Sequence, residues 1–124
     1  MSRTIGVPAL RPATAPSRRL STRLSATGCV WAYWHCQGHD DLSPVRDISI
    51  GGLFLETPKQ RPLGMPTRLH FLVDEGQILA DAVVRHVRPG IGLGLKFTAV
   101  SEKDRAKLAG LLTRLRRIQH ATNS

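Results

Sequence analysis

The chain has 124 residues, so one domain is the expected organisation, and a domain of this length buries roughly two thirds of its unfolded surface. A composition of 41% hydrophobic and 22% charged residues is typical of a globular protein. The longest apolar run, Cys29 to Trp34, has six residues, far short of the ~18 that a membrane span needs. These values argue against a membrane protein, a disulfide scaffold, a multidomain enzyme and a fully disordered chain.

The net charge of +9 is concentrated at the two ends of the chain. Residues 1–24 carry five Arg and no acid, residues 25–100 carry seven cations and seven acids, and residues 101–118 have a net charge of +4. A protein that holds duplex nucleic acid usually spreads its basic residues over a folded face. Basic ends on a neutral centre instead favour a small anionic ligand held by the N-terminal segment. A basic tail that contacts RNA or a membrane surface stays open as an alternative.

The first 24 residues are expected to form a flexible basic arm. Residues 1–17 are rich in Pro, Ala, Thr and Ser and contain few large apolar side chains, so they cannot build a core. The arm lacks the apolar stretch of a secretory signal, and its three prolines would break the amphipathic helix of a transit peptide. We therefore expect a cytoplasmic protein whose folded domain covers residues 25–119.

Short strands separated by turn residues are expected through the middle of the chain. Residues 38–43 are predicted to form a polar turn, and Gly51-Gly52 to form the turn of a hairpin. A loop rich in Pro and Gly follows, and Asp74-Glu75-Gly76 and Arg88-Pro89-Gly90 mark two later turns. Between these turns the pattern predicts about six strands, near residues 26–36, 45–50, 53–55, 69–73, 78–87 and 93–97. Regularly spaced short strands favour a small sandwich or barrel.

The period changes to that of a helix over about residues 101–118. Ser101 is a plausible N-cap, with Asp104 three residues later. One face of the predicted helix is apolar, with Leu108, Leu111, Leu112, Leu115 and Ile118 in register. This stripe must pack on the strands of the same chain or on a partner.

One polar motif, Asp47-Ile48-Ser49-Ile50-Gly51-Gly52, carries candidate binding chemistry. On a strand, Asp47 and Ser49 point to one face, whereas both isoleucines point to the other and are expected in the core. A carboxylate and a hydroxyl together suit a guanine edge, which offers two N–H donors. The two glycines let the chain turn tightly and let a ligand approach the backbone. The alternative is a plain hairpin turn whose Asp and Ser bond nearby backbone groups.

A second candidate lies in the arm, at Arg18, Arg19 and Arg23. Arg19 and Arg23 share one side of the chain in either a helix or an extended segment. Two guanidinium groups on one side can grip phosphates or the O6/N7 edge of guanine. The same spacing also occurs by chance in an Arg-rich chain, so a solvated basic tail is the alternative.

Metal binding and catalysis find little support in the sequence. Cys29, His35, Cys36 and His39 lie close together but lack the paired spacing of zinc ligands, and we expect neither a metal nor a disulfide. The glycines of Gly90–Gly94 enter a predicted strand rather than a helix, and other catalytic motifs are lacking. We therefore expect no enzyme and no catalytic residues.

In order and spacing, these motifs resemble those of the PilZ domain family. The family signatures R-x-x-x-R and [DN]-x-S-x-x-G correspond to Arg19–Arg23 and Asp47–Gly52. Gly92–Phe97 and Ser101–Arg105 also resemble the last strand of the family and the start of its helix. The resemblance covers about residues 18–118.

The resemblance implies a mainly β fold, a six-stranded antiparallel Greek-key-type barrel with a C-terminal helix, that binds the bacterial messenger cyclic di-GMP. By analogy Arg19 and Arg23 would contact phosphates and guanine faces, Asp47 and Ser49 would hold a guanine, and Gly52 would keep the turn open. Gly51 is included among the expected ligand-binding residues. An Arg at the position of Arg18 often accompanies a stacked ligand pair in the family. The arm would become ordered around the nucleotide, and the signal would pass to an unidentified protein effector.

Two other functions stay open at this stage. The first is a protein-interaction module without nucleotide binding, which would use the aromatic strand or the basic helix end at Arg114, Arg116 and Arg117. Those cations also simply suit the helix dipole. The second is a small barrel that binds single-stranded nucleic acid through Trp31, Tyr33 and the basic arm. Aromatic residues are scarce in the chain, so we do not expect nucleic acid as a partner.

Overall fold

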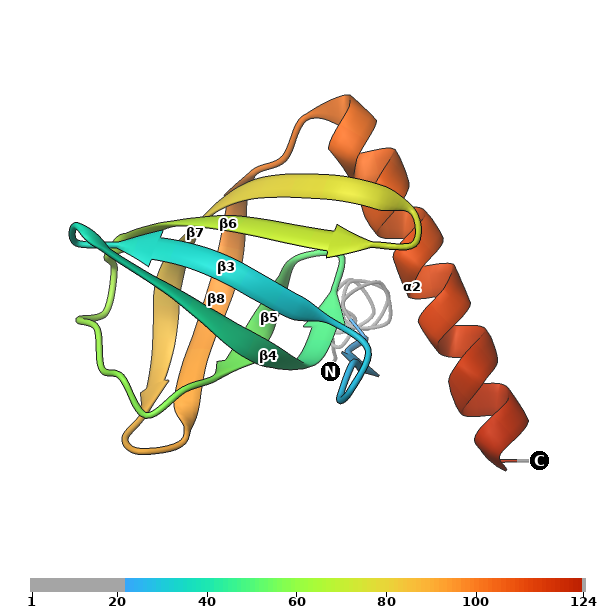
Figure 1. Cartoon of the computed structure of the whole chain (residues 1–124), viewed down its shortest axis with the longest axis horizontal. Helices are drawn as coiled ribbons and strands as arrows, with labels where there is room; N and C mark the ends of the chain where they lie inside the picture. Colours follow the sequence, from blue (N-terminus) through green and yellow to red (C-terminus); the bar gives the residue numbers. More distant parts are fainter. Residues whose placement is uncertain (1–21, 124) are drawn as a thin grey trace, which may run out of the picture.

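The computed structural model describes residues 22–123 and consists of seven strands followed by a helix over that range. Figure 1 shows their arrangement. The elements are β2 (Leu24–Ser25), β3 (Trp31–Cys36), β4 (His39–Ser49), β5 (Gly52–Glu56), β6 (Pro66–Val73), β7 (Gly76–Arg88), β8 (Gly92–Ala99) and α2 (Glu102–Asn123).

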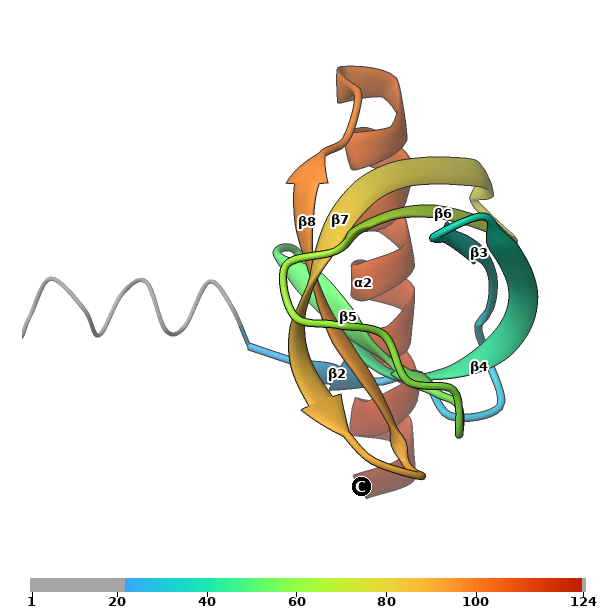
Figure 2. The same ribbon diagram turned by 90° about the vertical axis from the view of Figure 1, so that its left-hand side faces the viewer.

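Six of the strands close into an antiparallel barrel, which confirms the predicted fold. Their order is β4-β3-β6-β7-β8-β5, and pairing of β5 with β4 closes the circle. Strands β3, β4 and β5 follow one another as hairpins, and β6 then returns to lie beside β3, which is the Greek-key pattern. The short strand β2 adds to the outer side of β4. Figure 2 looks into the barrel, with α2 lying along it.

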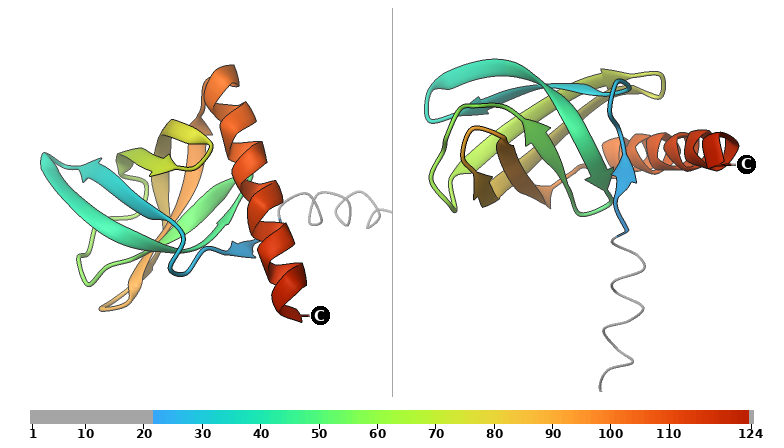
Figure 3. Two further views of the ribbon diagram at one scale, coloured as in Figure 1. Left: turned by 45° about the vertical axis from the view of Figure 1, so that its right-hand side comes forward. Right: turned by 90° about the horizontal axis from the view of Figure 1, so that it is seen from below.

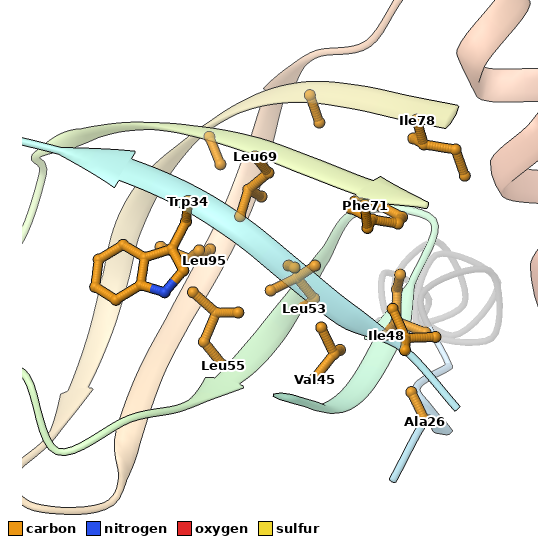
Figure 4. Packing of buried hydrophobic residues seen from close by; sticks show 14 of the residues in the cluster. Ala26, Trp34, Val45, Ile48, Leu53, Leu55, Leu69, Phe71, Ile78 and Leu95 are labelled. Carbon is orange, nitrogen blue, oxygen red and sulfur yellow. The ribbon is translucent and has the colours of Figure 1, made fainter. Parts of the chain in front are cut away.

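Alternating side chains fill the barrel. In β3 the side chains of Ala32, Trp34 and Cys36 are buried, whereas those between them are exposed. Residues from every strand meet in the centre, as Figure 4 shows for Trp34, Leu53 and Phe71 among others. The one polar atom of Trp34, Nε1, donates a 2.9 Å hydrogen bond to Oγ of buried Ser43, so the indole is satisfied inside the core.

The prediction of a polar turn over residues 38–43 is wrong. The turn between β3 and β4 consists of Gln37 and Gly38 alone, and β4 begins at His39. Both turn residues have positive φ, 54° and 78°, as in the tight turns whose twist matches that of paired strands. The polar residues after them are polar because this end of β4 is largely exposed, not because the chain turns there.

The first predicted strand also begins later than expected, at Trp31 instead of residue 26. Residues 26–30 form a turn in which the Ala26 carbonyl accepts hydrogen bonds from the N–H groups of Cys29 and Val30. Cys29 is exposed and Cys36 is buried, and both thiols are free.

The C-terminal helix packs on its own barrel. The Ser101 Oγ accepts a 3.1 Å hydrogen bond from the Asp104 N–H, which confirms the predicted N-cap. The four leucines of the predicted stripe are buried, but Ile118 is exposed. The helix contacts β7 and β2, and Figure 3 shows it lying beside the barrel in two views. The helix runs to Asn123, five residues beyond the predicted end, and its last turns extend past the barrel (Figure 1). Among the described residues, no helix is both long and apolar enough to cross a membrane.

Candidate functional site

The motif around Ser49 forms the turn between β4 and β5. Ser49 is buried, and its Oγ accepts a 3.2 Å hydrogen bond from the Gly51 N–H and donates a 3.4 Å bond to the Gly52 carbonyl. The hydroxyl therefore braces the turn, as the plain structural alternative required. It also lines the adjacent pocket.

The strand ends at Ser49, which corrects one expectation. Alternation along a strand predicts that Ile48 and Ile50 both enter the core. Ile48 is fully buried, but Ile50 is exposed. Ile50 is the first residue of the turn, where the chain leaves the strand and the alternation of faces no longer applies.

Gly52 allows the turn to lie directly on β8. A Cβ atom at this position would overlap the carbonyl oxygen of Leu95, so a larger residue forces the backbone apart. The adjacent Gly51 carbonyl accepts a 2.8 Å hydrogen bond from the Phe97 N–H. At Gly51 itself a Cβ would meet only the Ser49 Oγ, 4.0 Å away. The two glycines thus have different tasks, and only Gly52 is required by close packing.

Asp47 and Arg23 come together through the short strand β2. Ser25 pairs with Asp47 in the β2–β4 ladder, so Arg23, which directly precedes β2, is held near the carboxylate. Arg23 Nη1 is 2.8 Å from Asp47 Oδ1, and their side chains are 46% and 26% exposed. The pair joins the two sequence motifs, and part of each side chain stays open to solvent and to a ligand.

An open pocket of about 290 Å³ lies beside this pair. On one side the pocket is lined by Ser49 and Gly51 of the β4–β5 turn. Arg23, which directly precedes β2, also lines it. The opposite wall comes from β7 and β8, through residues that the sequence did not indicate as binding candidates. These residues are Arg85, His86, Gly94, Leu95 and Lys96.

The β7 wall is shaped by a bulge. In the β7–β8 ladder Val84 pairs with Leu95 and His86 pairs with Gly94, so Arg85 is the extra residue of an irregular register. The His86 ring covers Gly94, where an added Cβ would lie 3.2 Å from the ring. Local alternation could not reveal this wall, because the bulge and the β7–β8 pairing decide which side chains reach the pocket.

The pocket is electropositive. Arg23, Arg85 and Lys96 line it, and neither Arg85 nor Lys96 forms an ion pair with a residue in the described part of the chain. Asp47 compensates only Arg23. Guanidinium groups donate paired hydrogen bonds to phosphate oxygens, so Arg23 and Arg85 can hold a compact anion, and Lys96 adds a third positive charge.

Two of the predicted binding residues, Arg18 and Arg19, lie outside the described residues. The structure does bring together Arg23, Asp47, Ser49, Gly51 and Gly52 at one side of the barrel. The other cluster singled out by sequence includes His35, whose Nδ1 lies 2.5 Å from Asp40 Oδ1. Within residues 22–123 no three His, Cys, Asp or Glu side chains gather as metal ligands.

Comparison with known families identifies the fold. The sequence model of the family described as PilZ domain matches residues 17–114. The chain belongs to the PilZ domain family. The match begins before the described residues and includes both signatures, and no curated protein sequence matches the chain significantly.

Solved PilZ structures share the architecture at low sequence identity. The PilZ domain with c-di-GMP of YcgR from Escherichia coli is 19% identical with a TM-score of 0.66, and the match covers 86% of this chain and 97% of that one. The PilZ domain of CeSA from a cellulose synthesizing bacterium is 18% identical with a TM-score of 0.61, over 77% and 99% of the two chains. The K. pneumonia MrkH–c-di-GMP complex is 20% identical with a TM-score of 0.65, over 82% and 52%.

Proposed function

We propose that this PilZ domain is a non-enzymatic receptor for cyclic di-GMP in the bacterial cytoplasm. The ligand would bind at the pocket between the β4–β5 turn and strands β7 and β8. The observation that carries the proposal is the 2.8 Å contact between Arg23 and Asp47, because it joins the two signature motifs at the edge of an electropositive pocket. Two structural neighbours, YcgR and MrkH, are described with this nucleotide, which supports the proposal.

The phosphates would be held by the cations of the pocket. Cyclic di-GMP carries two phosphate charges, and Arg23, Arg85 and Lys96 offer three positive groups on two sides of the pocket. Arg18 and Arg19 would add two guanidinium groups from the preceding segment. Each bidentate guanidinium contact contributes roughly 1–3 kcal/mol, and micromolar binding requires about −8 kcal/mol, so several such contacts together with base stacking are sufficient.

The guanine edge would be held by Asp47. A carboxylate accepts hydrogen bonds and matches the two N–H donors of guanine, whereas Arg23 occupies only one of its oxygens at 2.8 Å. The Ser49 hydroxyl and the open space over Gly51 complete the polar rim of the pocket. The ion pair between Arg23 and Asp47 would thus orient both side chains for the ligand, and it leaves one carboxylate oxygen of Asp47 to accept hydrogen bonds from the base.

We propose further that the N-terminal segment becomes ordered when the ligand binds. Residues 1–24 carry five Arg and no acid, so a polyanion would offer favourable contacts to the guanidinium groups of the segment. The ordering lowers the net affinity, because conformational freedom is lost on binding. A protein effector would then recognise the ordered segment and transmit the signal.

The proposal is tested by calorimetric titration of cyclic di-GMP into the full chain and two variants. In Arg23→Ala the affinity should fall roughly ten- to hundred-fold, because a bidentate contact is lost and Asp47 is left uncompensated beside an anion. Arg68→Ala is the matched control, since Arg68 also pairs with a carboxylate, that of Asp81 at 3.4 Å, but lies on β6 away from the pocket. Its affinity should equal that of the wild type.

Equal affinities in all three proteins would contradict the site assignment. Equal losses in both variants would indicate a general effect of net charge, and would also contradict it. Thermal unfolding of each variant checks that the barrel is intact, which the exposure of both arginines leads us to expect.

A further inference from the structure

The outer face of β3 and β6 carries large apolar side chains in adjacent positions. Leu72 is 74% exposed, Tyr33 is 59% exposed and Trp31 is 52% exposed. Tyr33 pairs directly with His70 across the two strands, with their ring centroids 6.5 Å apart. Trp31 and Leu72 each lie one residue beyond the Ala32–Phe71 pair, so they are neighbours too.

The same face extends to the flanking strands. Leu42 of β4 pairs with Tyr33, and Leu79 of β7 pairs with His70, so one row of side chains crosses four strands. Both leucines are nearly half exposed. Together these side chains leave on the order of 500 Å² of apolar surface in water, near the upper end of the range for a monomeric protein. We name Trp31, Tyr33, Leu42, Leu72 and Leu79 the outer patch.

We propose that the outer patch is the interface of a symmetric dimer of this chain. Each partner in a standard interface buries about 800 Å² of surface. Homodimer interfaces are about 65% apolar, so each partner buries roughly 500 Å² of apolar surface. The outer patch supplies that amount. An isologous interface brings the same surface from both copies together, so each Trp31 and Tyr33 would be covered by the partner's patch.

The charges around the outer patch support a second copy over a charged partner. Arg68 pairs with Asp81, and His35 contacts Asp40. Cations and acids are therefore mixed at its edge, and the excess of +9 lies in the terminal segments instead. A surface of mixed sign does not attract a polyanion or an anionic membrane, and it lets two copies approach without strong repulsion.

The dimer would leave the nucleotide pocket accessible. None of the five residues of the outer patch lines the pocket beside Arg23. The inference is therefore independent of the proposed function, and either can fail without the other.

Sedimentation equilibrium of the full chain, from about 1 µM to about 1 mM, tests the interface. The wild type should show a concentration-dependent dimer, and Leu72→Glu should raise the dimer dissociation constant by at least about a hundred-fold, because the symmetric interface repeats the lost contact and the new charge on both sides. Leu63→Glu is the matched control: Leu63 is also a highly exposed leucine, but it lies in the β5–β6 loop outside the outer patch. It should leave the dimer unchanged.

Tryptophan fluorescence gives a second measurement on the same samples. The chain has two tryptophans, and Trp34 is already buried, so a blue shift that grows with protein concentration reports the covering of Trp31. The shift should be lost in Leu72→Glu and in a second variant, Tyr33→Glu. A wild type that stays monomeric throughout would overturn the inference and leave the outer patch to another occupant. A dimer that Leu72→Glu leaves intact, or that Leu63→Glu weakens equally, would also overturn it.

Discussion

At the scale of single residues, the two glycines of the β4–β5 turn show why a motif needs a structure to explain it. The sequence predicted that both glycines let the chain turn tightly, and the family resemblance assigned the opening of the turn to Gly52. The structure assigns the strict requirement to Gly52, whose missing Cβ makes room for the Leu95 carbonyl. Gly51 has no such neighbour.

Gly52→Ala should therefore lower the free energy of unfolding by about 1–3 kcal/mol, because the turn has to move away from β8. Gly51→Ala, one residue earlier, should change it by less than about 0.5 kcal/mol. Urea unfolding of both variants measures the difference. Equal losses would contradict the close contact between the turn and β8.

The sequence motifs predicted the binding candidates on one side of the pocket but not the residues on the opposite side. Arg23, Asp47 and Ser49 belong to recognisable motifs, so they could be proposed before their contact was known. Arg85 lies in no motif, and Lys96 lies in the strand segment Gly92–Phe97, which resembles the family without indicating a binding residue. They reach the pocket through the β7–β8 pairing and the bulge at Arg85, which local sequence patterns do not encode.

If Arg85 contributes to ligand binding, Arg85→Ala should weaken cyclic di-GMP binding roughly three- to ten-fold and reduce its dependence on salt concentration, since one cation is removed from the pocket. Arg88→Ala is the matched control, because Arg88 lies on the same strand but does not line the pocket. Titrations at two salt concentrations measure both effects. A loss in Arg88→Ala as large as that in Arg85→Ala would show that only net charge matters.

At the scale of elements, the docking of α2 depends on one buried side of the helix and on ion pairs of Arg114 with Asp74 and Glu75. Arg114 donates hydrogen bonds of 2.8 and 3.0 Å to the two carboxylate oxygens of Glu75, in the turn between β6 and β7. These hydrogen bonds from Arg114 hold the pKa of Glu75 below its ordinary value of 4.5. The helix is thereby tied to the barrel on the side where its leucines enter the core.

Because the pKa of Glu75 is lower in the folded state than in the unfolded state, its contribution to stability is fully present above about pH 4.5 and is lost as the pH falls through the folded value. Glu75→Gln should reduce the free energy of unfolding by about 1 kcal/mol at neutral pH, and this difference should shrink below about pH 4. Asp81→Asn serves as the control, because Asp81 also pairs with an arginine, Arg68, but its side chain is more exposed than that of Glu75. Urea unfolding at neutral pH and below about pH 4 measures this difference in the free energy of unfolding between wild type and Glu75→Gln. A difference that is the same at both pH values would contradict the linkage.

Element boundaries were harder to predict than element types. The strand and helix periods were clear, and the N-cap at Ser101 was correct. The β3–β4 turn was placed too widely, because polar residues on the exposed end of β4 resemble turn residues in sequence. The two-residue turn depends on positive φ at Gln37, a residue type for which the sequence carries no such signal.

At the scale of the whole molecule, the barrel, the Greek-key order and the C-terminal helix were predicted. Which side chains lie together on each outer face of the barrel was not predicted. The motif order allowed the fold to be named, since the family resemblance supplied the long-range pairing that local patterns lack. The neutrality of the central region was also visible in the sequence. That the helix stripe packs on its own barrel, and that Trp31 and Tyr33 face outwards beside Leu72, required the three-dimensional structure.

The distribution of charge over the molecule supports the proposal of a small anionic ligand. A neutral barrel presents one electropositive pocket beside Arg23, and the preceding segment carries further arginines. This arrangement supports the proposal of a small dianion as ligand, since a long polyanion is usually held by basic residues spread over a folded face, whereas residues 25–100 carry no net charge.

The most direct test of this account is calorimetric titration of the full chain with cyclic di-GMP, with GTP as the control nucleotide. We predict saturable binding at micromolar affinity or tighter for cyclic di-GMP and much weaker binding of GTP, and a stoichiometry near two would support a role for Arg18 in holding a ligand pair. An absence of heat at several temperatures, or equal binding of GTP, would contradict the account and leave both motifs as a turn and a basic tail.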